Sequence, residues 1–203
     1  MTTQRKELLA ATGRALGAAE TFLAAAHRRL IARVAPEGAV EPERVTTEQL
    51  AAHAFAWMAT YVEALRQIRN WAVQLDQGGA LGELEGLTLE IAFGEYLAQL
   101  AGGIAMSQGE FARPQELGLA DHEIAPLRAA DAGALSAGLA AARMRLGSRL
   151  AAGGEAGLGA LGVGDASLEM IREEVRRFAC REIAPHAQQW HRRDELIPLP
   201  VVE

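Results

Sequence analysis

Alanine and leucine recur at helical spacing along most of this chain, and few stretches are rich in the β-branched residues that favour strands. Half of the 203 residues are apolar and only 5% are aromatic. Alanine and leucine have the most favourable intrinsic helix propensities, and no stretch shows a convincing strand pattern. The sequence therefore predicts an all-α fold, an antiparallel helical bundle with enough apolar surface for a sizeable core.

Two helices are expected in the first third of the chain. The first covers about residues 4–34, where leucines recur on one stripe. Proline and glycine then indicate a loop. The second helix is expected to start at Thr46, because Thr46 and Gln49 fit the capping-box pattern, and to end near Asp76 before two glycines.

Two more helices are expected before a glycine-rich stretch. One runs from about residue 81 to 108, and the other spans about residues 127–150, with Asp121 to Glu123 as a polar turn ahead of it. The first of this pair carries several glycines, which cost stability unless a neighbouring helix packs closely against them. These glycines are Gly86, Gly94, Gly102 and Gly103.

The chain is expected to have three parts. Residues 1–152 form a helical extension, and glycines make 153–164 a linker rather than a phosphate-binding loop, because no strand precedes them. In residues 165–203, a helix is expected to start at the cap residues Asp165 or Ser167.

Prolines divide this last part. Pro185 is expected to end or restart its first helix, and a short helix follows around residues 186–191. The chain stops in a run that starts with Pro198 and Pro200, as a helix begins rather than as a domain finishes. We expect residues 165–203 to be the truncated start of a domain that continues past Glu203.

Charge and hydropathy exclude several classes of partner. The net charge is −6, and a nucleic-acid-binding domain would have a basic excess, so no nucleic-acid partner is expected. No 18-residue apolar run and no signal peptide are present, which predicts a cytoplasmic protein with no membrane partner. The single cysteine, Cys180, excludes a disulfide framework within the chain. Arginines near the C-terminus are expected to pair with neighbouring carboxylates: Arg172, Arg176, Arg177, Arg181, Arg192 and Arg193.

No metal-binding, catalytic or cofactor-binding residue is predicted. The histidines lack the spacing of a metal site, and His186 and His191 are expected to cap or pair with Glu182 or Asp194. The five histidines are His27, His53, His122, His186 and His191.

The carboxylate and aromatic clusters allow two interpretations each. The pairs Glu83 with Glu90 and Glu169 with Glu173 could act as general acid and base, but we expect solvent-facing positions. Glu90 and Glu95 interrupt an apolar helix and are expected to pair with Arg66 or Arg69. The aromatic group could line a ligand pocket, although core packing is the favoured interpretation; it comprises Trp57, Tyr61 and Trp71.

Residues 169–190 read Glu-Met-Ile-Arg-Glu-Glu-Val-Arg-Arg-Phe-Ala-Cys-Arg-Glu-Ile-Ala-Pro-His-Ala-Gln-Gln-Trp, and Pro198-Leu-Pro200 follows. This stretch resembles the N-terminal helices of the acyl-CoA dehydrogenase family, in which Val-Arg-x-Phe-x-x-x-x-Ile-x-Pro precedes a short helix with Trp or Tyr and a third helix after a proline. Residues 46–120 are more loosely similar to the C-terminal bundle of that family. A helical extension joined to a dehydrogenase by a glycine-rich linker is the layout of the (2S)-methylsuccinyl-CoA dehydrogenases.

The resemblance implies an FAD-dependent enzyme that oxidises an acyl-CoA at its α–β bond, with a short branched dicarboxylic acyl group of the methylsuccinyl-CoA type. It also implies an electron-transfer flavoprotein as partner and a homo-oligomer. No residue of this chain matches the family's catalytic base or FAD contacts, so FAD is expected to be bound mainly by regions beyond residue 203. The segment itself is expected to be structural. The alternative is a non-enzymatic helical interaction or oligomerisation module.

Overall fold

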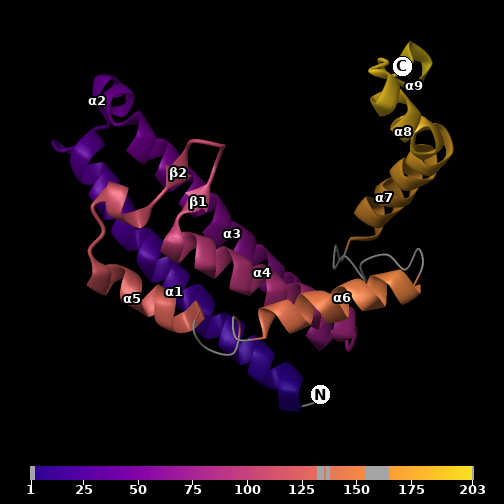
Figure 1. Ribbon diagram of the computed structural model, residues 1–203, viewed down its shortest axis with the longest axis horizontal. Helices are drawn as coiled ribbons and strands as arrows, with labels where there is room; N and C mark the ends of the chain where they lie inside the picture. The colour runs from indigo at the N-terminus through magenta and orange to yellow at the C-terminus, as the bar shows by residue number, and fades with distance from the viewer. Residues whose placement is uncertain (1–2, 132–134, 136–137, 154–164, 203) are drawn as a thin grey trace. The chain divides into compact units, whose positions relative to one another are not determined.

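The computed structural model describes residues 3–131, 135, 138–153 and 165–202. The chain divides into two compact units, Met1–Leu161 and Gly162–Glu203, which are considered one at a time. In the described residues, α-helices dominate both units and one small hairpin of two-residue strands lies in the first (Figure 1). The predicted all-α class is confirmed.

Four helices form the core of the N-terminal unit: α1 (Thr3–Val34), α3 (Gln49–Gln77), α4 (Glu83–Gly102) and α5 (Asp121–Asp131). Figure 1 shows α1 and α3 side by side and running in opposite directions. Their apolar stripes bury large side chains against one another. The largest of the fully buried side chains are Phe22, Met58, Leu65, Leu81, Leu89, Phe93, Leu97, Leu100, Ile104, Leu117, Ile124 and Leu127.

The predicted start of the second helix is wrong. A short helix α2 (Pro42–Thr47) precedes α3, which begins only at Gln49. Thr46 does not act as a cap, because its hydroxyl donates a hydrogen bond to the carbonyl of Pro42 one turn back (3.0 Å) within α2. Leu50, in the first turn of α3, is 72% exposed, because α3 turns its neighbour Ala51 toward the core.

The third helix is shorter than predicted and a hairpin follows it. Gly103 has φ +121°, a conformation that side chains rarely adopt, and it ends α4. Strand β1 (Ile104–Ala105) then pairs antiparallel with β2 (Phe111–Ala112), and a 3₁₀ turn, η1 (Pro114–Leu117), follows. Two-residue strands are too short to show the alternation of apolar and polar residues that identifies a strand. The sequence therefore predicts a continuous helix over this hairpin.

The predicted fourth helix is two helices. Asp121 to Glu123 form the first turn of α5 rather than a lead-in turn, and α6 (Leu139–Gly153) is a separate helix. Glu123 stabilises the start of α5, because its carboxylate accepts the backbone N–H of Ala120 (2.9 Å) and the guanidinium of Arg29 (3.0 Å). The predicted linker lies outside the described residues, except for Gly153, the last residue of α6.

Close helix contact at a glycine, as predicted for α4, is confirmed at Gly94. A Cβ at this position would lie 3.0 Å from Leu139 Cδ1 and 3.1 Å from the carbonyl oxygen of Leu135. Gly102, in contrast, meets nothing within 4 Å. Gly13 in α1 has a related role, because the guanidinium of Arg69 from α3 lies 3.0 Å from the position of its missing Cβ.

We expect Gly94→Ala to lower the free energy of unfolding by about 1–3 kcal/mol, because the methyl group must displace Leu139 and the Leu135 carbonyl. Gly17→Ala is the matched control, because its Cβ would meet nothing within 4 Å. It should stabilise the chain by about 1 kcal/mol through helix propensity alone. Urea unfolding followed by helical circular dichroism measures both. Equal stabilisation by the two substitutions would contradict the close packing.

The contacts of Glu123 predict a specific acid sensitivity. The Ala120 backbone N–H and, next, Arg29 favour its ionised form and hold the pKa of this carboxyl below its ordinary value of 4.5. Their stabilising effect is complete above that ordinary pKa and is lost as the pH falls through the lowered one. Glu123→Gln should therefore lose less stability than the parent when urea unfolding is repeated below pH 4.5. Glu37→Gln, which removes a carboxylate from the loop after α1, is the control and should lose as much stability as the parent.

Candidate functional site

The C-terminal unit begins with a well-formed helix cap. Asp165 accepts backbone hydrogen bonds from Ser167 (2.8 Å) and Leu168 (3.1 Å), and helix α7 (Ala166–Phe178) follows. These bonds satisfy N–H groups that the first helical turn leaves without partners. The predicted start of this helix is confirmed.

Pro185 lies at the start of a new helix, so the prediction that it ends or restarts the helix is confirmed. A π-helical turn, η2 (Ala179–Ile183), connects α7 to α8 (Ala184–Arg193), and Pro185 lies in the first turn of α8. Proline has no N–H and its ring collides with the carbonyl of a regular preceding turn, so a widened turn is a physical solution. Asp194 ends α8 with φ +53°, and α9 (Leu199–Val202) comes after Pro198. The expected short helix around 186–191 is confirmed.

An apolar stripe of α7 faces solvent in this unit. Leu168, Ile171, Val175 and Phe178 recur at helical spacing, and their exposed fractions are 53, 57, 61 and 39%. We call these four residues the apolar face. None of the described residues from 165 to 202 is buried. A stripe of this kind is stable when another element covers it, so the apolar face is the best candidate in this unit for a docking surface.

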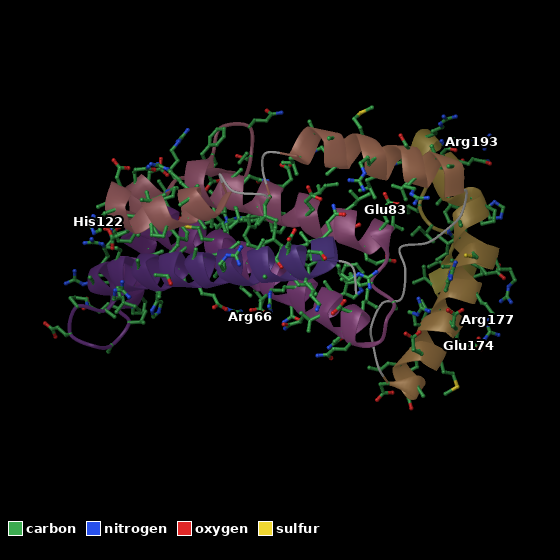
Figure 2. All side chains as sticks on the ribbon, turned by 90° about the horizontal axis from the view of Figure 1, so that it is seen from below. Arg66, Glu83, His122, Glu174, Arg177 and Arg193 are labelled. Atoms are coloured by element: carbon green, nitrogen blue, oxygen red, sulfur yellow. The ribbon has the colours of Figure 1, made fainter. Side chains whose placement is uncertain are left out.

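On the other sides of α7, arginines form ion pairs with neighbouring glutamates. Arg172 binds Glu169 (2.8 Å) and Glu173 (2.9 Å), and Arg177 binds Glu174 (2.9 Å). Figure 2 shows Glu174 and Arg177 together on the outside of the helix. The predicted ion pairing is confirmed for these arginines. Glu169 and Glu173 therefore share one guanidinium.

The histidines do not gather into a site. His186 lies 5.6 Å from the ring of Trp190, while Glu182, one of its expected partners, binds Arg181 instead. In the N-terminal unit, His53 lies between the Glu110 carboxylate (3.1 Å) and the indole N–H of Trp57 (3.0 Å). Among the residues that the structure describes, no three His, Cys, Asp or Glu side chains lie close enough together to hold a metal ion. Nor does any helix among them combine the length and the hydropathy of a membrane span.

The aromatic residues of α3 pack against the core. Tyr61 stacks on Tyr96 of α4 at 4.5 Å and meets Trp57 edge-on at 6.3 Å. Its hydroxyl donates to Gln99 Oε1 (3.0 Å), and partial burial, followed by the nearby Tyr96, raises the pKa of Tyr61. Trp71 also packs against the core. The core-packing interpretation is therefore confirmed over an aromatic ligand pocket.

The expected partners of the α4 carboxylates are wrong. Glu95 pairs with Arg143 of α6, whereas Arg66 is bound to Glu20 (2.9 Å) and to Glu63. A pairing partner of a helix residue can come from any neighbouring helix, and spacing along the chain does not identify which one. Within the described residues, no ion pair to Glu90 is found.

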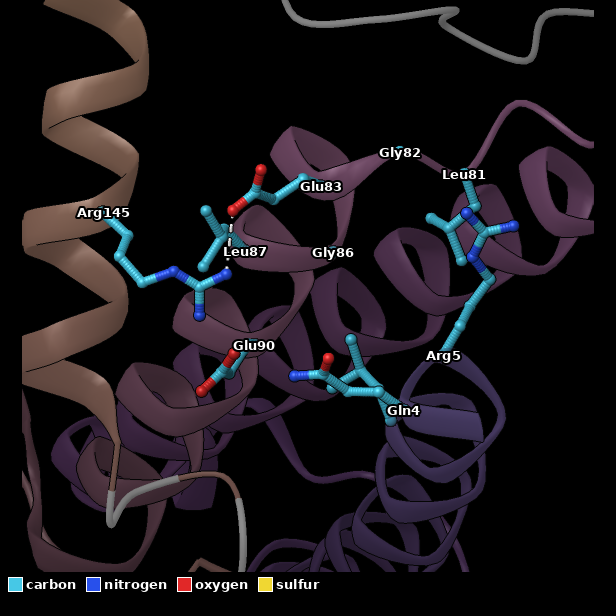
Figure 3. Close-up of a pocket in the computed structure, with 10 residues that line it drawn as sticks. Gln4, Arg5, Leu81, Gly82, Glu83, Gly86, Leu87, Glu90 and Arg145 are labelled. Carbon is cyan, nitrogen blue, oxygen red and sulfur yellow. Dashed lines mark hydrogen bonds and ion pairs between the residues drawn. The ribbon is translucent and has the colours of Figure 1, made fainter. Parts of the chain in front are cut away.

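A cavity of about 320 Å³ lies where α1, α4 and α6 meet (Figure 3). Glu83 on its rim binds Arg145 (2.9 Å) and Arg149 (2.9 Å to Nε), which lower the pKa of its carboxyl, Arg149 most. Acidic and basic side chains balance around the cavity, with apolar ones between them. Its lining comprises Gln4, Arg5, Leu8, Leu81, Gly82, Glu83, Gly86, Leu87, Glu90 and Arg145.

Three arginines of the two units are already engaged and do not present free guanidinium groups to a cofactor such as FAD. The guanidinium groups of Arg145, Arg172 and Arg177, which could otherwise meet phosphate oxygens, are each bound to carboxylates. The helices of the C-terminal unit present an exposed surface with no buried residue among those described. We therefore assign no cofactor contact to these residues.

Comparison with known proteins adds two findings. Residues 165–203 match the model of the acyl-CoA dehydrogenase N-terminal domain. A (2S)-methylsuccinyl-CoA dehydrogenase from Cereibacter sphaeroides is 47% identical over 199 residues, which cover 97% of this chain and 36% of that protein. The chain thus spans about a third of the length of this curated relative. The chain is therefore similar over nearly its whole length to a (2S)-methylsuccinyl-CoA dehydrogenase, and residues 165–203 are similar to the acyl-CoA dehydrogenase N-terminal domain.

Proposed function

We propose that this chain is the N-terminal part of an FAD-dependent acyl-CoA dehydrogenase that oxidises a short branched dicarboxylic acyl-CoA, of the methylsuccinyl-CoA type, at the α–β bond. The supporting observation is that the 47% identity extends over 97% of the chain. It therefore includes the helical extension as well as the widely shared domain at residues 165–203. An extension held in common with a methylsuccinyl-CoA dehydrogenase is the feature that favours this substrate class over others.

The described segment has a structural role in this proposal. The apolar face of α7 is the surface on which the rest of the dehydrogenase domain would pack, and the bundle of α1, α3, α4 and α5 has its own core. The catalytic base and the FAD contacts would come from regions beyond residue 203. An electron-transfer flavoprotein as acceptor, a homo-oligomeric state and a cytoplasmic location are part of the same proposal.

The protein expressed from its full reading frame tests the proposal. We expect it to purify with a flavin absorption spectrum and to reduce an artificial electron acceptor when (2S)-methylsuccinyl-CoA is added. Butyryl-CoA and isobutyryl-CoA test the substrate class, because their acyl groups lack the free carboxylate that methylsuccinyl-CoA carries. Residues 1–203 alone are the control and should purify without flavin.

Two results would overturn different parts of this proposal. A colourless full-length protein that oxidises no acyl-CoA would reject the enzyme. It would support the alternative, a helical interaction module in which the apolar face of α7 binds another protein. A yellow protein that prefers monocarboxylic substrates would keep the enzyme class and reject the dicarboxylic substrate.

The apolar face gives a second test in the same full-length protein. Val175→Asp would bury a carboxylate against apolar partners, at a cost of several kcal/mol, so we expect thermal stability and flavin content to fall together. Arg176→Asp introduces the same side chain at the adjacent exposed position and should change neither strongly. Equal behaviour of the two variants would contradict docking through the apolar face.

A further inference from the structure

Helix α6 makes its extended contact with a single helix of the bundle, α4. Apolar burial is concentrated at its start. Leu139 packs against Gly94, and Ala142 is 2% exposed. The first turn of α6 is therefore anchored by close packing, in the way that the helices of the bundle are.

The remainder of α6 has little apolar anchoring. Met144 and Leu150 are 72% and 44% exposed, and Leu146 alone among residues 143–152 is half-buried. Hydrophobic stabilisation scales with the apolar area removed from water, so one half-buried leucine contributes little over these ten positions. Another interaction must hold this part of the helix in place.

Arg143, at the start of this part, pairs with Glu95 of α4, and Glu83 provides the interaction for the residues after it. Glu83 lies in the first turn of α4, and its carboxylate binds Arg145 Nη2 (2.9 Å) and Arg149 Nε (2.9 Å). The two arginines are four residues apart, which places them on the same side of α6. Figure 3 shows the bond between Glu83 and Arg145 across the junction of the two helices. One carboxylate thus connects two consecutive turns of α6 to α4.

The ion pairs between Glu83 and the two arginines are weak because they are exposed to water. The side chains of Glu83, Arg145 and Arg149 are 40, 54 and 61% exposed. Exposed ion pairs contribute little to stability and are weakened by dissolved salt. We propose that Glu83 is an electrostatic clasp for residues 145–153 of α6, and that this part of the helix detaches from α4 when salt screens the clasp.

Detachment would affect the end of the helix itself. Residues 145–153 form the C-terminal part of α6, and a helix end without tertiary packing frays readily in water. This inference stands on the contacts of α6 and does not depend on the proposed enzyme.

Amide hydrogen exchange tests the clasp. At low salt, the Glu83→Gln variant of the 203-residue chain should exchange amides of residues 145–153 about fivefold faster than the parent. About 1 M NaCl, where the Debye length is about 3 Å, should accelerate the parent to a similar rate and leave the variant nearly unchanged. Glu63→Gln, which removes the ion pair with Arg66 on α3, is the matched control and should leave α6 at the parent rate.

A second variant keeps the test decisive. Amides of α1 and α3 should exchange at the parent rate in Glu83→Gln, which shows that the bundle is intact. If they do not, the double substitution Arg145→Gln and Arg149→Gln removes the clasp from the other side and leaves α4 unaltered. Protection of residues 145–153 that is the same in parent and clasp variants, or an equal response of both to salt, would overturn the proposal.

Discussion

The packing of α1, α3, α4 and α5 around shared apolar side chains is the interaction on which the N-terminal unit depends. Phe22 of α1, Met58 of α3 and Phe93 of α4 belong to one buried cluster and are at most 1% exposed. This cluster removes apolar surface from water and so offsets the conformational entropy of ordering long helices. Other features, among them the hairpin, the surface ion pairs and α6, are attached to a framework that this cluster stabilises.

Helical periodicity carried most of the information about the fold. On α1, the predicted stripe is partly confirmed. Leu16, Ala19, Ala26 and Leu30 are buried, Leu8, Leu9 and Leu23 are half-buried, and Ile31 is 36% exposed. Phe22 was missing from that prediction, although it lies on the same side of the helix. Helix ends were less accessible, because they depend on single backbone conformations. Gly103 ends α4 through a positive φ, and nothing in the residue type distinguishes it from Gly102, which is still helical.

Ion-pair partners on different helices could not be predicted from the spacing of residues along the sequence. The sequence identified Glu95 as a carboxylate in need of a cation and favoured arginines of the second helix. Arg143 of α6 supplies the cation instead, 48 positions further along the chain than its partner, since α6 packs on α4. The local ion pairs of α7 were predictable because their partners lie within one turn. The family motif at residues 169–190 was readable for the same reason, since it is a local pattern.

The widened turn at Ala179–Ile183 has a consequence for how this segment can change. A π-helical turn contains one more residue than a regular turn, and each residue of an α-helix rotates the chain by about 100°. Because the wide turn and a regular turn each complete about one rotation, removal of a single residue here would leave Trp190 and the rest of α8 at nearly the same rotation relative to α7. It would, however, bring the ring of Pro185 against the carbonyl one regular turn back. A deletion in this stretch should therefore be opposed by the steric demand of Pro185 and not by a change in the angular relation between the two helices.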